Sequence, residues 1–244
     1  MTRWPASALC GFDLETTGPN PQTDRIVSAC VVHSGPIRTD LQVTTWLADP
    51  GIAIPDAATA VHGISTRRAR AEGRPAADVV AELVAALAGA ANIGTPIVIM
   101  NAPFDLTILE READRYGIKS LFSRSVPYVI DPRVLDKQVD RYRRGRRRLE
   151  DLCRVYGVNL KGAHTANGDA LAAVRVARRI GLFHPKIGDT DPAELHKQQA
   201  AWAREQNESF ARYLRNTPGR EHEADAVSTE WPLIPAQREG GDAS

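Results

Sequence analysis

Hydrophobic and polar positions in the first half of the chain predict several short strands. Apolar or alternating runs bounded by turn-forming residues fit strands better than helices. Five such runs are present, at residues 8–13, 26–33, 41–47, 96–100 and 128–130. The first three follow one another with short turns between them, which favours an antiparallel meander.

Longer segments with helical spacing dominate the rest of the chain. Helices are predicted over residues 75–90, 103–116, 148–156, 169–180 and 192–216. The last begins at Asp191-Pro192, which fits a cap and a first helical position. From Thr217 onward the chain is rich in proline, glycine and charge, so we expect disorder apart from an anchor at Trp231-Pro232-Leu233-Ile234.

Composition places the chain among ordinary globular proteins. It has 244 residues, 43% of them hydrophobic and 25% charged, which excludes disorder of the whole chain. We therefore expect an α/β domain over residues 1–185, a helical extension over 186–216 and a disordered tail over 217–244. The net charge of +1 gives no global field, so any binding of a polyanion depends on local basic patches.

Cysteine usage and hydropathy bear on the compartment. The three cysteines lack metal-pair spacing, which fits buried thiols in a reducing compartment and favours neither a disulfide nor zinc. The first residues lack the apolar stretch of a signal peptide, and Asp78 and Glu82 interrupt the apolar segment at 76–91. We expect a cytoplasmic protein without a membrane span.

Four carboxylates are placed where they can converge. Asp13 and Glu15 lie two apart near a strand end, so alternation puts both on one face. Asp105 and Asp169 each fall in the first turn of a predicted helix, where the helix dipole favours the ionised form, with Asn167-Gly168 as the apparent cap of the second. Each acid alone also fits a solvated turn or a simple helix stabiliser. Together they predict a site for Mg²⁺ or Mn²⁺ ions, since clustered carboxylates need cations to neutralise them.

His164 adds a base to this set. It lies in a loop of small residues, five positions before Asp169, and an unperturbed imidazole can accept a proton from water at neutral pH. A surface histidine without function is the alternative. Two divalent ions about 4 Å apart can hold the attacking and leaving oxygens of a phosphate in line, so the set favours a two-metal phosphodiesterase.

The motifs around these residues closely resemble those of the DEDDh exonucleases. They are Phe12-Asp13-Leu14-Glu15-Thr16-Thr17-Gly18, Val61-His62-Gly63-Ile64, Asn101-Ala102-Pro103-Phe104-Asp105 and His164-Thr165-Ala166-Asn167-Gly168-Asp169. The nearest branch resembles the proofreading epsilon subunit of bacterial DNA polymerase III and its stand-alone relatives, over about residues 7–182. Thr165, in place of a tyrosine, favours the histidine branch over the tyrosine branch. Asn167-Gly168 departs from the apolar or larger residues that are more usual in the family.

The resemblance implies an RNase H-like fold, with a five-stranded mixed sheet and helices on both faces. It also implies 3′-to-5′ release of nucleoside monophosphates from single-stranded or frayed ends, with DNA favoured over RNA. It implies that Asp13, Glu15, Asp105 and Asp169 bind two metal ions, with Asp13 bridging them, and that His164 is the general base. The pocket for the terminal nucleotides would be formed by Thr17, Val61, His62 and Phe104. The segment at 61–64 also fits a plain helix-ending turn.

Several alternatives stay open. The same residues would serve an enzyme that trims RNA 3′ ends, and the fold could also serve an inactive nucleic-acid-binding or polymerase-tethering module. A third alternative is an exonuclease that works as a subunit of a DNA polymerase, with residues 191–244 as the docking segment. Residues 141–148 contain six arginines, which fit either a clamp on substrate phosphates or a solvated charge run.

Overall fold

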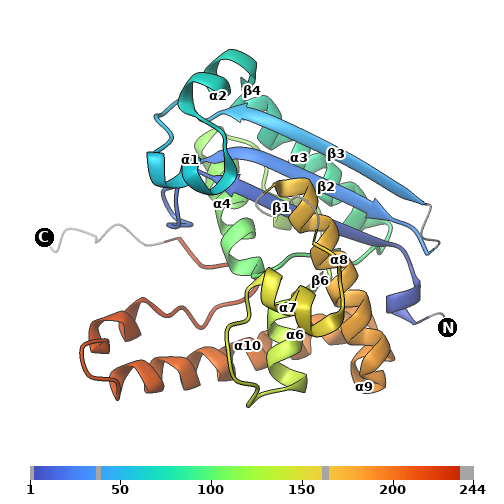
Figure 1. The fold of residues 1–244 in the computed structure, drawn as a ribbon. Helices are drawn as coiled ribbons and strands as arrows, with labels where there is room; N and C mark the ends of the chain where they lie inside the picture. The colour runs from blue at the N-terminus through green and yellow to red at the C-terminus, as the bar shows by residue number, and fades with distance from the viewer. Residues whose placement is uncertain (1–2, 37–39, 161–164, 237–244) are drawn as a thin grey trace, which may run out of the picture.

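A six-stranded mixed sheet forms the centre of the computed structural model, which describes residues 3–36, 40–160 and 165–236 (Figure 1). Its strand order is β4-β3-β2-β1-β5-β6. Neighbouring pairs among β1, β2 and β3 are antiparallel, while β5 is parallel to β1, β6 to β5 and β4 to β3. The strands are β1 Leu9–Thr16, β2 Ile26–Ser34, β3 Leu41–Asp49, β4 Arg74–Pro75, β5 Ile97–Val98 and β6 Val129–Ile130.

The sixth strand departs from the five that we expected. β4 is only two residues long and pairs with the end of β3 at Ala48 and Asp49. Gly73 makes this approach possible, because a Cβ there would lie 2.6 Å from the Asp49 nitrogen. Such a short segment carries no hydrophobic period, so the pattern of the sequence could not reveal it.

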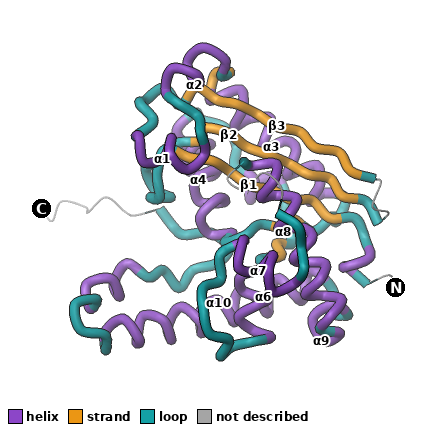
Figure 2. The backbone as a smooth tube through the Cα atoms, viewed as in Figure 1, coloured by secondary structure: helices purple, strands orange, loops and turns teal. Residues whose placement is uncertain are grey.

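Helices cover both faces of the sheet (Figure 2). The helices α3 and α4 pack against one face, and α8, with α7 beside it, packs against the other. The helices are α1 Asp56–His62, α2 Thr66–Glu72, α3 Ala76–Asn92, α4 Ala102–Arg115, α5 Leu121–Arg124, α6 Pro132–Val139, α7 Leu149–Tyr156, α8 Ala166–Phe183, α9 Pro185–Gly188 and α10 Pro192–Arg215, with 3₁₀ turns η1 Trp4–Ala6 and η2 Glu221–Ala226. No helix in the described part of the chain has the length and apolar character needed to cross a membrane.

The two faces of β1 pack against different helices. Phe12 and Leu14 point into the core with α3 and α4. The alternate residues Gly11, Asp13 and Glu15 face α8. Gly11 lets α8 come close, because a Cβ there would lie 2.9 Å from the Ala170 carbonyl oxygen. The strand thus brings carboxylates directly against the N-terminal half of α8.

The helix α10 closes the sheet at β6. His196 Nδ1 accepts a hydrogen bond from the Val129 N–H at 3.1 Å. Gln199 accepts from the Asp131 N–H at 2.8 Å and donates to the Val129 carbonyl at 2.9 Å. Side chains of α10 therefore satisfy the backbone of an edge strand that would otherwise be open.

The chain after α10 folds back over the domain. Trp231 is 8% exposed and its ring lies 4.9 Å from that of His196. The Ile234 N–H donates to the Thr107 hydroxyl at 3.0 Å. The segment at 231–234 thus contacts the domain, as expected of an anchor. The expectation of disorder does not describe residues 217–230, which include η2 and a hydrogen bond from Asn207 to the Ser228 carbonyl. Residues 237–244 lie outside the described part.

Candidate active site

Three of the predicted carboxylates converge between β1 and α8. Ligand oxygens of Asp13, Glu15 and Asp169 lie within 4.8 Å of one another. We had expected Asp13 at the end of its strand, but the strand runs on past it to Thr16. Pairing of β1 with β2 continues through Thr16, so both acids lie inside the sheet rather than in a solvated turn.

Asp105 lies beside this group but outside the 4.8 Å cluster. It is 4% exposed in the first turn of α4, and its Oδ1 accepts a hydrogen bond from the Leu14 N–H at 3.0 Å. That bond fixes the carboxylate next to the backbone between Asp13 and Glu15. The fourth predicted acid is thus held against β1, the strand on which Asp13 and Glu15 lie.

Asp131 positions the start of α4, and our reading of the sequence assigned it no role beyond ending a strand. It is 1% exposed and its carboxylate accepts from the N–H groups of Asn101 at 3.1 Å and Ala102 at 3.0 Å. Asn101 has left-handed backbone angles, with φ of 66°. The bonds from Asp131 hold this turn, which leads directly into the helix that carries Asp105. The Asp131-Pro132 pair after a strand was the available signal.

Electrostatics favour a cation at the cluster. Burial, with repulsion from Asp105, Asp169 and Glu15, raises the pKa of Asp13 well above its usual range. Burial also raises the pKa of Asp105, against its hydrogen bond from Leu14. Burial and the charge of Asp169 raise the pKa of Glu15 to about 7. The protein thus holds carboxylates together at an electrostatic cost that a divalent ion would remove.

The start of α8 differs in detail from the sequence prediction. The cap is Thr165, whose hydroxyl accepts from the Gly168 N–H at 3.3 Å, instead of Asn167-Gly168. Asp169 still falls in the first turn. His164, the predicted general base, lies outside the described residues, so its role stays a prediction.

The four predicted pocket residues are placed unequally. The Thr17 hydroxyl donates to Asp24 at 2.8 Å and accepts from the Arg25 N–H at 3.0 Å, so it holds its own turn instead of pointing a free donor at a ligand. Val61 is 54% exposed at the end of α1, and Phe104 is partly buried in the first turn of α4.

His62 is oriented by the turn after α1. Its Nδ1 accepts from the Ile64 N–H at 3.1 Å, which leaves the second ring nitrogen as the protonated one in the neutral ring. Burial lowers the pKa of His62, against a raising effect of the Thr16 backbone. The ring is therefore neutral at physiological pH and sits near the end of β1.

A buried carboxylate divides the arginine run into two sets. Asp136 is 0% exposed and forms ion pairs with Arg143 and, at 2.8 Å, with Arg147. Arg141 pairs with Glu205 at 2.8 Å. The others, Arg144, Arg146 and Arg148, form no ion pair among the described residues. Neither a uniform clamp nor a fully solvated run describes the segment.

A mixed sheet with helices on both faces, and carboxylates that converge from β1 and α8, is the RNase H-like arrangement that we predicted, with one strand more than expected. The chain belongs to the exonuclease family RNase_T, which matches residues 10–177. Among curated proteins, no sequence matches this chain.

Solved structures of exonuclease I share the fold. A zinc-bound complex of the Escherichia coli enzyme with single-stranded DNA has 19% identity and a TM-score of 0.62, over 85% of this chain and 45% of that one. The same enzyme with a dT13 oligonucleotide has 19% identity and a TM-score of 0.58, over 74% and 42%. The enzyme of Methylocaldum szegediense has 19% identity and a TM-score of 0.59, over 85% and 46%. This chain thus spans less than half the length of these proteins.

Proposed function

We propose that this protein is a divalent-metal-dependent 3′-to-5′ exonuclease that releases nucleoside monophosphates from single-stranded or frayed DNA ends. The observation that carries the proposal is the convergence of Asp13, Glu15 and Asp169 within 4.8 Å, with Asp105 tied to the intervening Leu14 backbone. Solved exonuclease I structures of the same fold include complexes with DNA oligonucleotides, which favours DNA as the substrate.

The donor set fits Mg²⁺ or Mn²⁺. All four side chains offer carboxylate oxygens, and burial with mutual repulsion raises the pKa values of Asp13 and Asp105, so a cation is favoured at this place. Bound divalent ions supply Lewis acidity and neutralise charge at the phosphate. Asp13, Glu15, Asp105 and Asp169 are the residues that would hold the ions.

The other residues would position the substrate and move a proton. His164 would accept the proton of the attacking water, because its loop leads into the helix of Asp169. Val61, His62 and Phe104 would contact the terminal nucleotides. Thr17 would shape this pocket through its turn, since its hydroxyl is used internally.

The test is release of mononucleotides from 3′-labelled and 5′-labelled single-stranded DNA with Mg²⁺. We expect stepwise shortening from the 3′ end, abolished by Asp13→Ala and by His164→Ala. Glu72→Gln, on the exposed surface of α2, serves as a control that also removes one carboxylate. Shortening from the 5′ end, or full activity of the Asp13 variant, would refute the assignment.

An RNA 3′-end trimming enzyme is the main alternative, and matched DNA and RNA oligonucleotides in the same assay distinguish the two. An inactive binding or tethering module would retain the labelled DNA intact. A polymerase subunit remains compatible with the site. However, the tail considered for docking packs on its own domain through Trp231 and Ile234.

A further inference from the structure

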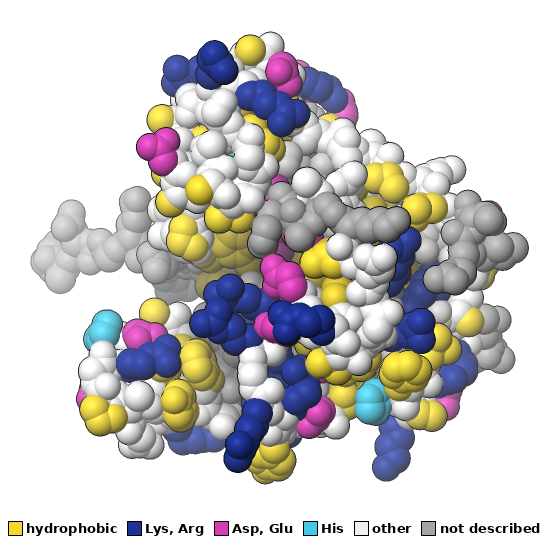
Figure 3. Space-filling model, in the orientation of Figure 1, with side chains coloured by type: hydrophobic (Ala, Val, Ile, Leu, Met, Phe, Trp, Pro, Cys, Tyr) yellow, Lys and Arg dark blue, Asp and Glu magenta, His cyan; other side chains and the backbone are white. Residues whose placement is uncertain are grey.

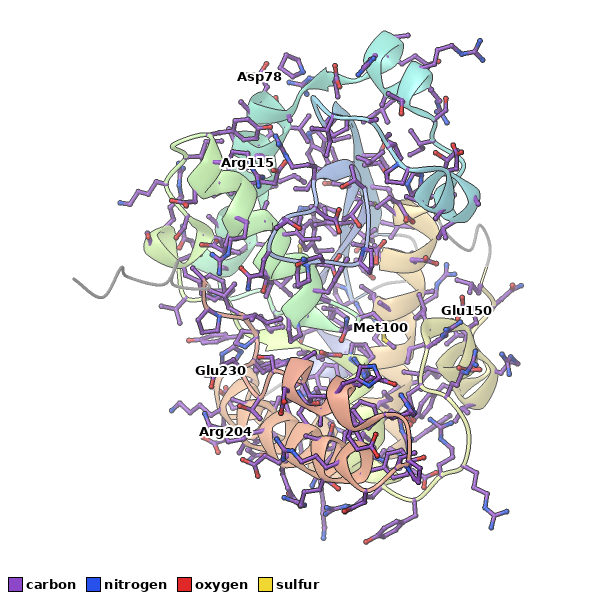
Figure 4. All side chains as sticks on the ribbon, turned by 90° about the vertical axis from the view of Figure 1, so that its left-hand side faces the viewer. Asp78, Met100, Arg115, Glu150, Arg204 and Glu230 are labelled. Carbon is purple, nitrogen blue, oxygen red and sulfur yellow. The ribbon has the colours of Figure 1, made fainter. Side chains whose placement is uncertain are left out.

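A cleft of about 750 Å³ opens at the start of α4, and Pro103 in its lining lies two residues before Asp105. Met100, Asn101 and Pro103, at the start of the helix that carries Asp105, line one end of it, and Met100 lies where the main body faces α10 (Figure 4). The helix α6 and the arginine loop at 145–149 form one side, and α10 with Trp231 forms the other. The cleft thus leads away from the proposed site of hydrolysis.

The lining of this cleft is cationic. Figure 3 shows Lys and Arg side chains gathered where α10 and the chain after it meet the main body, beside Asp and Glu side chains near the middle of that face. The basic lining residues are Arg133, Lys137, Arg146, Arg147 and Arg148. Among the described residues that line it, Asp131 is the only carboxylate, and backbone N–H groups already occupy its oxygens.

Two of these cations are available to a ligand. Asp136 neutralises Arg147, Arg133 donates to the Asn101 side chain, and Lys137 donates to the Arg141 carbonyl at 3.0 Å. Arg146 and Arg148 are exposed and form no ion pair among the described residues. The chain as a whole carries a charge of only +1, so this local excess of positive charge is a property of the cleft.

Exposed aromatic rings stand on the opposite wall. Phe210 and Tyr213 on α10 both line the cleft and are 44% and 58% exposed. Their ring centroids lie 6.4 Å apart with planes 17° from parallel. Flat rings facing a cationic side are the combination that binds unpaired bases together with their phosphates.

This wall is fixed relative to the carboxylate cluster. Side chains of α10 bond to the backbone of β6 through His196 and Gln199. The returning chain is joined to α10 by a 2.8 Å hydrogen bond from Asn207 to the Ser228 carbonyl. The wall also lies outside residues 10–177, which match the exonuclease family. It is therefore a feature of this chain beyond the matched domain.

We propose that this cleft binds the single strand on the 5′ side of the nucleotide being removed, with Arg146 and Arg148 on phosphates and Phe210 and Tyr213 on bases. The inference rests on the proposed exonuclease function. It predicts that a long oligonucleotide gains affinity from the cleft and that a substrate with one nucleotide does not. The occupant is a nucleic-acid strand, because an acidic peptide would use the arginines without the stacked rings.

The experiment compares two variants with matched controls. Arg146→Ala with Arg148→Ala removes two cations from the cleft, and Arg144→Ala removes an exposed, unpaired cation of the same loop that does not line it. Phe210→Ala with Tyr213→Ala removes the rings, and Tyr142→Ala removes a ring that is 88% exposed elsewhere. Affinity for a fluorescent dT20 is measured by anisotropy over a range of salt concentrations, with Ca²⁺ in place of Mg²⁺. Hydrolysis of the p-nitrophenyl ester of thymidine 5′-monophosphate monitors the carboxylate cluster.

We expect the arginine pair to lower the magnitude of the salt slope by about 1.4, at about 0.7 per phosphate contact. We expect the ring pair to weaken dT20 binding by about 5-fold or more. Both losses should exceed any change in ester hydrolysis, and both controls should bind like the wild type. Equal losses in variants and controls, or polyglutamate competing as well as dT20, would overturn the cleft assignment. A wild-type protein that binds dT20 through the cleft yet hydrolyses neither substrate would instead refute the proposed exonuclease.

Discussion

Removal of the Asp131 carboxylate should uncouple the start of α4 from the sheet. In Asp131→Ala, the N–H groups of Asn101 and Ala102 lose their acceptor, and the second of these donors is fully buried. A buried donor without a partner costs about 1–3 kcal/mol, so we expect a loss of about 2–5 kcal/mol in the free energy of unfolding. Asp131→Asn keeps one oxygen and should lose about half as much.

Activity should fall as well, because the same bonds hold the left-handed turn at Asn101. When the turn relaxes, the first turn of α4 moves and takes Asp105 away from the Leu14 N–H. We expect the ester hydrolysis of Asp131→Ala to decrease at least 10-fold at a temperature where the variant is folded. Urea unfolding measures the first effect, and turnover of the thymidine ester measures the second.

Asp136→Ala is the matched control. Asp136 is also fully buried, and it accepts from the Tyr156 hydroxyl at 2.9 Å while pairing with Arg147. Its loss should lower stability and leave ester hydrolysis close to that of the wild type. The reasoning fails if Asp131→Ala loses less than 1 kcal/mol, or if both variants lose stability equally and retain the same ester hydrolysis.

Three further predictions follow from particular contacts. In Gly11→Ala, the added Cβ should push α8 away from β1 at Ala170. The main effect should be weaker Mg²⁺ binding, measured by calorimetry, and the urea midpoint should fall less. Mg²⁺ binding at pH 7 should release protons, because Glu15, with a pKa of about 7, is about half protonated there. Calorimetry in buffers of different ionisation enthalpy should show this release, and Glu15→Gln should reduce it. Burial lowers the pKa of His196 below its value of about 6.5 in the unfolded chain, so its neutral form stabilises the fold above that pH and this contribution is lost as the pH falls below it. His196→Gln should therefore make the urea midpoint less sensitive to pH between 7 and 5.

Features encoded by local pattern were predictable from the sequence. The meander of β1 to β3, the long helices and the shared face of Asp13 and Glu15 follow from periods of two and 3.6 residues. The prediction ended β1 at Asp13 because polar residues there broke the apolar run. The structure continues the strand, since backbone pairing with β2 tolerates carboxylates that the site requires.

Features that depend on distant partners were not predictable. Nothing local shows that Asp136 pairs with Arg147, or that Trp231 packs against His196 from another part of the chain. The short helices α2 and α6 were also missed, although Asp131-Pro132 has the cap and first-position chemistry that opens α6. Of α1, the sequence indicated only its end, as the alternative of a helix-ending turn at 61–64. Tertiary contact decides such elements more than propensity does.

The position of α10 links the closure of the sheet at β6 with the proposed cleft. An edge strand can be closed by another strand or by side chains, and here His196 and Gln199 do it from a helix. His196 and Gln199 lie in the first half of α10, whereas Phe210 and Tyr213 lie near its C-terminal end, where the helix has passed β6 and lines the cleft beside the cationic loop. The same helix that closes the sheet therefore also forms one wall of the cleft that we propose as the path of the strand.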